Sequence, residues 1–267
     1  MPDFVEFALI AGGAALCSPL AGWASLLLRP NTLLLSLVAG LAGGVLVGAI
    51  CFEMIPQAVE SAGLFATGGA FALGLALVYA LDLYINRGAV AGPNADQASK
   101  VRGFHRRHRP RGSKVTVLAG GTSAEELIEG VVIGVSAAIS GNMGLVVGLA
   151  IALDNISEAL TIGEMVRAGK DKREGEPESG KARPWRILGW TGLIGLALLA
   201  AAAVGWFALR SLPPFWLGSL SAVGAGAIFY LAASNLLPEA ESNQYLRSGA
   251  LAAAAGLLAM LVLTEVT

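Results

Sequence analysis

Hydrophobic residues along the chain gather into eight long apolar runs, separated by short polar stretches and by two longer charged ones. A helix that crosses the hydrocarbon core of a bilayer needs about 20 mostly apolar residues, and each run is long enough. The runs cover residues 5–28, 32–59, 64–86, 115–139, 142–167, 186–209, 215–240 and 246–265. The pattern predicts an all-α polytopic membrane protein with eight transmembrane helices, forming a single transmembrane domain over residues 1–267.

Two polar segments interrupt the apolar runs and set the expected orientation. Residues 87–114 contain a basic run with His105 and His108, and residues 168–185 alternate basic and acidic side chains. With eight spans, 17 of the 18 lysines and arginines fall on one side of the membrane, and only Arg210 falls opposite. Because basic residues favour the cytoplasmic side, both loops are predicted to be cytoplasmic and both termini to face outward.

Composition agrees with a membrane protein and narrows the expected partners. The chain is 55% hydrophobic and only 14% charged, whereas soluble domains carry about 25% charged residues. The lipid bilayer is therefore an expected partner, nucleic acid is not, and a homodimer stays open. The acidic start of the chain does not resemble a cleavable targeting segment. High alanine and glycine usage hints at a bacterial inner (cell) membrane.

A weak internal repeat relates the second and seventh runs. Residues 44–56 and 226–238 both begin with glycine and end with proline, and Glu53 in the first corresponds to Asn235 in the second. The two runs cross the membrane in opposite directions. The pattern predicts an inverted repeat, with spans 1–3 and 6–8 arranged around the central pair of spans 4 and 5, as in many secondary transporters.

The central pair carries polar side chains at bilayer depth. The first triad is Glu125, Glu126 and Glu129, and the second is Asp154, Asn155 and Glu158. Each triad follows an i, i+1, i+4 pattern, so its members share an arc of roughly 100° on one helix face. An Asp near the middle of a span costs about 2.5–3.5 kcal/mol on an insertion scale, so five carboxylates need a compensating partner, and a bound cation is the simplest.

The two triads are predicted to meet. A short connection around residues 140–142 makes spans 4 and 5 antiparallel neighbours, and Glu129 and Asp154 are each about twelve residues from it, at the same depth. Oxygen donors suit Mg²⁺, Ca²⁺ and Mn²⁺, while Zn²⁺ also accepts carboxylates. Neither face contains histidine, which leaves manganese and iron(II) open beside zinc. A proton or sodium pathway through protonatable carboxylates is the alternative.

Other residues admit two interpretations. His105 and His108 either collect metal or belong to a solvated basic segment near anionic lipid. Glu53, Asp82 and Glu164 either line the route of an ion or face interfacial water. The sequence contains no His-Glu-x-x-His and no Gly-x-Ser-x-Gly motif, so no catalytic residue is assigned and no enzyme is expected. The alternatives to transport are an intramembrane metal-dependent enzyme and a metal-sensing protein without ion flux.

On these features the chain resembles the ZIP family of divalent-metal transporters. The resemblance covers nearly the whole chain: eight spans, outward termini and a long cytoplasmic loop after span three. Residues 125–130 and 154–159 are similar to the family's metal motifs on spans 4 and 5, typically His-Asn-x-Pro-Glu-Gly. The Pro-Gln-Ala and Pro-Glu-Ala segments at 56–58 and 238–240 are similar to the family's ends of spans 2 and 7.

The resemblance implies a role for each residue of the two triads. Glu125, Glu129, Asp154 and Glu158 would form the primary transport site, with Glu126 and Asn155 at an adjoining second metal position. The substrate would be zinc, iron, manganese or cadmium, carried toward the cytosol by an elevator-like or rocking movement of one helix bundle.

The chain also departs from the family pattern. Glu125 and Asp154 replace the usual first histidines, and Ile128 and Ser157 replace the usual prolines. The stretch 192–196 lacks the carboxylate that the family often has on span six. These departures indicate a divergent member.

Overall fold

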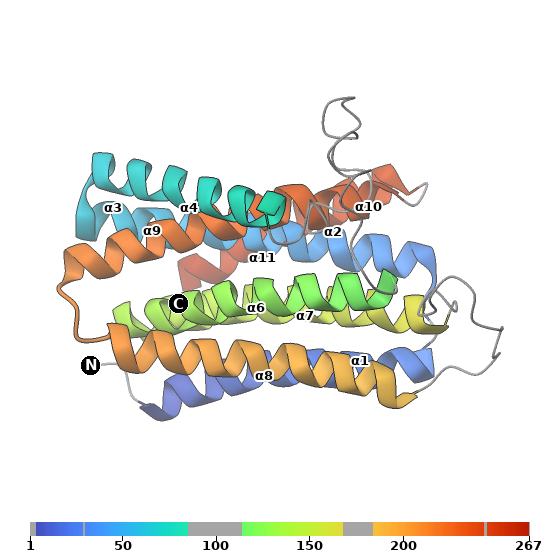
Figure 1. The fold of residues 1–267 in the computed structure, drawn as a ribbon. Helices are drawn as coiled ribbons and strands as arrows, with labels where there is room; N and C mark the ends of the chain where they lie inside the picture. The colour runs from blue at the N-terminus through green and yellow to red at the C-terminus, as the bar shows by residue number, and fades with distance from the viewer. Residues whose placement is uncertain (1–3, 29, 85–113, 168–183, 243–244, 267) are drawn as a thin grey trace.

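The computed structural model describes the chain except residues 1–3, 29, 85–113, 168–183, 243–244 and 267. The described residues fold into helices, with no strand among them (Figure 1). The elements are α1 (Phe4–Leu28), α2 (Thr32–Ala49), η1 (Ile50–Met54), α3 (Ile55–Ala62), α4 (Leu64–Tyr84), α6 (Lys114–Ile139), α7 (Gly141–Arg167), α8 (Pro184–Leu209), α9 (Pro214–Leu231), η2 (Ala232–Leu236), α10 (Leu237–Ser242) and α11 (Leu246–Val266). Most of the two predicted charged loops, with His105 and His108, lies outside the described residues.

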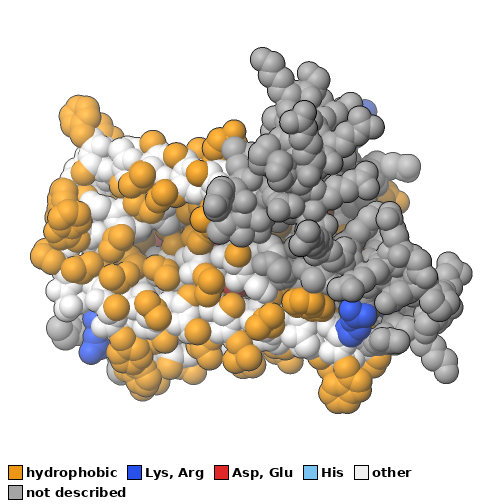
Figure 2. Space-filling model, viewed as in Figure 1, with side chains coloured by type: hydrophobic (Ala, Val, Ile, Leu, Met, Phe, Trp, Pro, Cys, Tyr) orange, Lys and Arg blue, Asp and Glu red, His pale blue; other side chains and the backbone are white. Residues whose placement is uncertain are grey.

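The all-helical prediction is confirmed, and the protein is a multi-pass membrane protein by the length and composition of its helices. Within the described chain, seven helical segments are long and apolar enough to cross a membrane. The helix α6 has 26 residues, comparable to its neighbours, but carries three glutamates in its middle. On the face shown in Figure 2, hydrophobic side chains cover the middle of the bundle, as lipid contact requires.

The long helices run alternately between two faces of the molecule (Figure 1). We call the end where α1 begins and α11 ends the terminus face. The opposite end, where α7 ends and α6 and α8 begin, is called the loop face. Because α7 runs from the terminus face to the loop face and α6 runs back, each residue number along them also gives a depth.

The helices form two bundles. The first bundle consists of α1, α6, α7 and α8, with its closest contacts between α6 and α8 and between α1 and α7. The second bundle consists of α2, α3, α4, α9, α10 and α11, with its closest contacts between α2 and α11 and between α4 and α9. In Figure 1 the first bundle occupies the lower half of the view and the second bundle the upper half.

Glycine allows the helices within each bundle to touch along their backbones. A Cβ atom on Gly44 would collide with the carbonyl oxygen of Ala253, and one on Gly226 would collide with that of Phe71. In the first bundle, Gly130 packs in the same way against Leu198. Small residues are what allow membrane helices to approach this closely, so each bundle is internally interlocked.

Two π-helical turns occupy corresponding places in the second bundle. In η1 the N–H of Ile55 donates to the oxygen of Ile50, and in η2 the N–H of Leu237 donates to the oxygen of Ala232. Each turn ends two residues before a proline, Pro56 or Pro238. Proline lacks an N–H and disturbs the α-helical ladder, and in both helices the disturbance takes the form of a π turn just before the proline. The inverted repeat itself stays a prediction.

Candidate functional site

The short connection between α6 and α7 is built as a capped turn. Ser140 lies between the helices, and its Oγ accepts a hydrogen bond from the N–H of Met143 at 3.0 Å, satisfying a free donor at the start of α7. Gly144 packs directly against Ala137 on α6. The predicted antiparallel pairing of these two helices is therefore confirmed, and it brings the two triads to the same depth.

The triads face the protein interior. The exposed fractions are 7% for Glu125, 1% for Glu126, 2% for Glu129, 4% for Asp154 and 1% for Asn155. Glu158 is half-buried. Leu127, on the opposite side of α6, is 52% exposed. The polar residues are therefore sheltered inside the bundle, while an apolar residue of the same helix faces outward.

The six polar side chains interact in pairs across the α6–α7 interface. Glu125 interacts with Glu158 through a side-chain hydrogen bond, and Glu129 does so with Asp154. Glu126 is paired with the Asn155 amide. Two carboxyl groups in contact repel each other unless they share a proton or hold a cation between them. The two carboxyl–carboxyl pairs are therefore the chemically distinctive part of the site.

The third pair lies deeper in the first bundle than the other two. The amide Nδ2 of Asn155 donates to the carbonyl oxygen of Ala14 on α1 at 3.4 Å. Asn155 therefore lies on the side of α7 that packs on α1, and Glu126 of α6 meets it there. Glu125 instead lines a small pocket together with Asp82 and Leu231 of the second bundle. The Glu126–Asn155 pair therefore lies inside the first bundle, whereas Glu125 faces the second bundle.

The donors meet in pairs and not in larger groups. Among the described residues, no three acidic, histidine or cysteine side chains lie close enough together to hold a metal ion as placed. Three buried oxygens of the site nevertheless have no hydrogen-bond partner, namely Glu126 Oε2, Asp154 Oδ1 and Asn155 Oδ1. Buried polar atoms without partners are costly, and oxygen atoms of this kind suit a hard or borderline cation. The donor chemistry therefore fits a cation, which would draw the pairs together.

Two carboxylates of the second bundle lie beside the triads. Asp82, near the end of α4, is 2% exposed, accepts a hydrogen bond from the Tyr230 hydroxyl at 3.0 Å and interacts electrostatically with Glu125. Glu239, on α10, interacts electrostatically with Asp154. The sequence signals were an acidic residue in an otherwise apolar run and the Pro-Glu-Ala segment, but neither indicated which triad it would approach.

The other acidic residues singled out from the sequence are placed as follows. Glu53 is half-buried in η1, toward the terminus face, and Glu164 is half-buried near the end of α7, toward the loop face. Whether they line the route of an ion stays a prediction.

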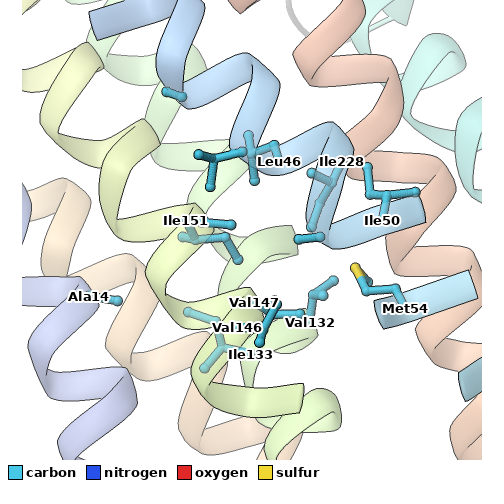
Figure 3. Packing of buried hydrophobic residues seen from close by; sticks show 14 of the residues in the cluster. Ala14, Leu46, Ile50, Met54, Val132, Ile133, Val146, Val147, Ile151 and Ile228 are labelled. Atoms are coloured by element: carbon cyan, nitrogen blue, oxygen red, sulfur yellow. The ribbon is translucent and has the colours of Figure 1, made fainter. Parts of the chain in front are cut away.

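An aliphatic layer separates the triads from the terminus face. It lies between the bundles, with side chains from α2, η1, α6, α7 and α9 packed together (Figure 3). Its members are Leu46, Ile50, Met54, Val132, Val147, Ile151 and Ile228. None of them is more than 4% exposed, whereas Thr161 and Glu239, toward the loop face, are half-buried. The triads are therefore closed off on the terminus side.

Tyr230→Phe tests how firmly Asp82 is held. The change removes the hydroxyl that donates to Asp82 and is expected to lower the free energy of unfolding by about 0.5–1.5 kcal/mol, measured as thermal unfolding in detergent. Tyr79→Phe is the matched control, because Tyr79 packs edge-on against the Tyr230 ring at 6.0 Å and is 48% exposed. Equal losses in both variants would show that the Tyr230 hydroxyl contributes nothing specific.

Comparison with known proteins does not assign the chain to a family. A scan against protein-family models finds no match, and a search of curated proteins finds no similar sequence. The resemblance to the ZIP family on the motifs of spans 4 and 5 therefore stays an expectation. The function has to be inferred from the geometry of the residues themselves.

Proposed function

We propose that the protein transports a divalent metal cation across the membrane, with the triads of α6 and α7 as the ion-binding site. The observation that carries the proposal is the pair of buried carboxyl–carboxyl contacts, Glu125 with Glu158 and Glu129 with Asp154. Acidic side chains inside a membrane are rare and usually functional. A divalent cation would neutralise the repulsion within both contacts and supply partners for the unpaired oxygens.

The donor set narrows the substrate. All six donor side chains bind through oxygen, which suits Mn²⁺ and Fe²⁺ and is also accepted by Zn²⁺. The ZIP resemblance favours zinc, with cadmium as a further candidate. A transporter must also release its ion, and a site without histidine or cysteine favours modest affinity for zinc. We therefore expect a transition metal as substrate, with zinc transported and manganese or iron competing.

The packing of the two bundles suggests how the ion would move. Glycine interlocks the helices within each bundle, whereas the contact between the bundles at the level of the site consists largely of aliphatic side chains. The aliphatic part of this contact can separate without breaking hydrogen bonds. We propose that the first bundle, which carries both triads, shifts as a unit against the second and exposes the site alternately to the two faces, as the ZIP resemblance implies. The bias of lysine and arginine supports transport toward the loop face, as the cytoplasmic side.

Uptake into sealed proteoliposomes tests this function. The purified protein is expected to carry Zn²⁺ down its gradient, with a rate that saturates and that Mn²⁺, Fe²⁺ and Cd²⁺ reduce in proportion to their affinity for the site. Empty liposomes measure the leak. Saturable binding of zinc without flux would replace transport by metal sensing. Flux of protons or Na⁺ that divalent ions neither follow nor inhibit would assign the carboxyl pairs to a monovalent pathway.

A further inference from the structure

A hydrogen bond between side chains joins the two bundles near the loop face. Thr161 on α7 donates from Oγ1 to Oε1 of Glu239 on α10 at 2.8 Å. Thr161 lies one turn beyond Glu158 and two turns beyond Asp154 on the same helix. The helix that supplies half of the ion site is therefore tied directly to the opposite bundle.

The Thr161–Glu239 hydrogen bond and the aliphatic layer lie on opposite sides of the triads. The aliphatic layer seals the triads on one side of the site, and the Thr161–Glu239 bond lies on the other side. If the first bundle moves as a unit along the second, as proposed above, the shift that separates the aliphatic layer also separates Thr161 from Glu239. The hydrogen bond therefore favours the arrangement in which the terminus face is closed.

We propose that the Thr161–Glu239 hydrogen bond is a latch that holds the first bundle in this arrangement. The inference rests on the proposed function, because a latch has a role only where the bundles move. Side-chain hydrogen bonds between membrane helices are individually modest, so loss of the latch shifts the equilibrium between the two arrangements by about three- to tenfold. The helices themselves remain folded.

Accessibility of a single cysteine measures the latch without any ion. Val147 is 1% exposed within the aliphatic layer, so Val147→Cys, with Cys17→Ser and Cys51→Ser, reports opening toward the terminus face. A membrane-impermeant thiol reagent is applied from each side in turn, in vesicles of known orientation. Thr161→Val and Glu239→Ala are each expected to raise the labelling rate from the terminus side about three- to tenfold.

Conservative variants separate the hydrogen bond from other effects. Thr161→Ser keeps the hydroxyl donor and Glu239→Gln keeps an acceptor oxygen, so both are expected to label near the parental rate. The double variant Thr161→Val with Glu239→Ala is expected to label no faster than Glu239→Ala alone, because Glu239→Ala already removes the Thr161 hydrogen bond together with the interaction with Asp154. The latch is rejected if neither single change alters labelling. It is also rejected if Glu239→Gln acts like Glu239→Ala while Thr161→Val has no effect, since the charge would then be responsible.

The labelling experiment and the uptake experiment can fail separately. Faster labelling of the latch variants, together with a parent protein that carries no divalent ion, would keep the latch and reject metal transport. Unchanged labelling, together with normal zinc uptake, would keep the transport function and reject the latch.

Discussion

Glu129→Gln is expected to reduce the initial rate of zinc uptake by at least about 30-fold, because it replaces a negatively charged ligand of the proposed ion site with a neutral amide and so leaves the bound cation without one of its charged partners. Removing one member of a buried charged pair costs about 2–5 kcal/mol in binding, which sets this scale. The volume of the side chain hardly changes. Membrane insertion should be retained, since a buried charge has been removed. Rates in proteoliposomes at equal protein content measure the effect.

Two glutamates serve as matched controls for this change. Glu60→Gln on α3 alters an exposed side chain and is expected to leave uptake unchanged. Glu126→Gln alters a buried side chain that pairs with the neutral Asn155 on the α1 side, and should reduce uptake less than Glu129→Gln. Full zinc uptake by the Glu129→Gln variant would exclude the carboxyl pairs as the ion site.

Gly44→Ala is expected to produce the largest loss of stability among conservative substitutions in the second bundle. The added methyl group would collide with the backbone oxygen of Ala253, which can move only if α2 separates from α11. Overpacking of this kind costs about 1–3 kcal/mol and occasionally more, or roughly 3–10 °C in Tm for a chain of this size. Thermal unfolding in detergent, followed by size-exclusion chromatography, measures the loss.

Gly12→Ala is the control for the change of residue itself. A Cβ on Gly12 of α1 has nothing within 4 Å, so the only effect is the higher helix propensity of alanine, worth up to about 1 kcal/mol in favour of the folded state. Similar Tm values for the two variants would mean that α2 and α11 are not held together by backbone contact at Gly44.

The helices were predictable because the bilayer imposes a minimum length on every span. The runs predicted at residues 142–167 and 186–209 correspond to Gly141–Arg167 and Pro184–Leu209. The grouping into two bundles was not predictable, because it depends on contacts between helices that are distant in the chain. The contact of Gly44 with Ala253 is an example, since each residue lies among other glycines, alanines and aliphatic residues, and nothing in the sequence distinguishes it from them. The π turns were also missed, because proline indicates a disturbance of the helix but not its form.

The site was predictable only where both partners are close in sequence. The short turn at Ser140 indicated that the two triads face each other, and the structure brings them together. The positions of Asp82 and Glu239 beside them were not predictable, because α4 and α10 approach the site only through the tertiary fold. The sequence predicted that the two triads meet, but it did not indicate which side chains would contact each other, and the described side chains interact in pairs. Helix faces indicate direction, but side-chain rotamers determine coordination.

The turn η2 has a consequence for how this chain tolerates insertions and deletions. A π turn holds one residue more than an α-helix needs over the same path, so everything beyond it is rotated by about 100° relative to an uninterrupted helix. Because η2 absorbs this extra residue, loss of a single residue between Ala232 and Leu236 would restore regular winding and leave Glu239 facing Thr161, whereas regular winding without that loss would turn Glu239 away. This five-residue stretch is therefore the place in the second half of the chain where loss of one residue is expected to be tolerated.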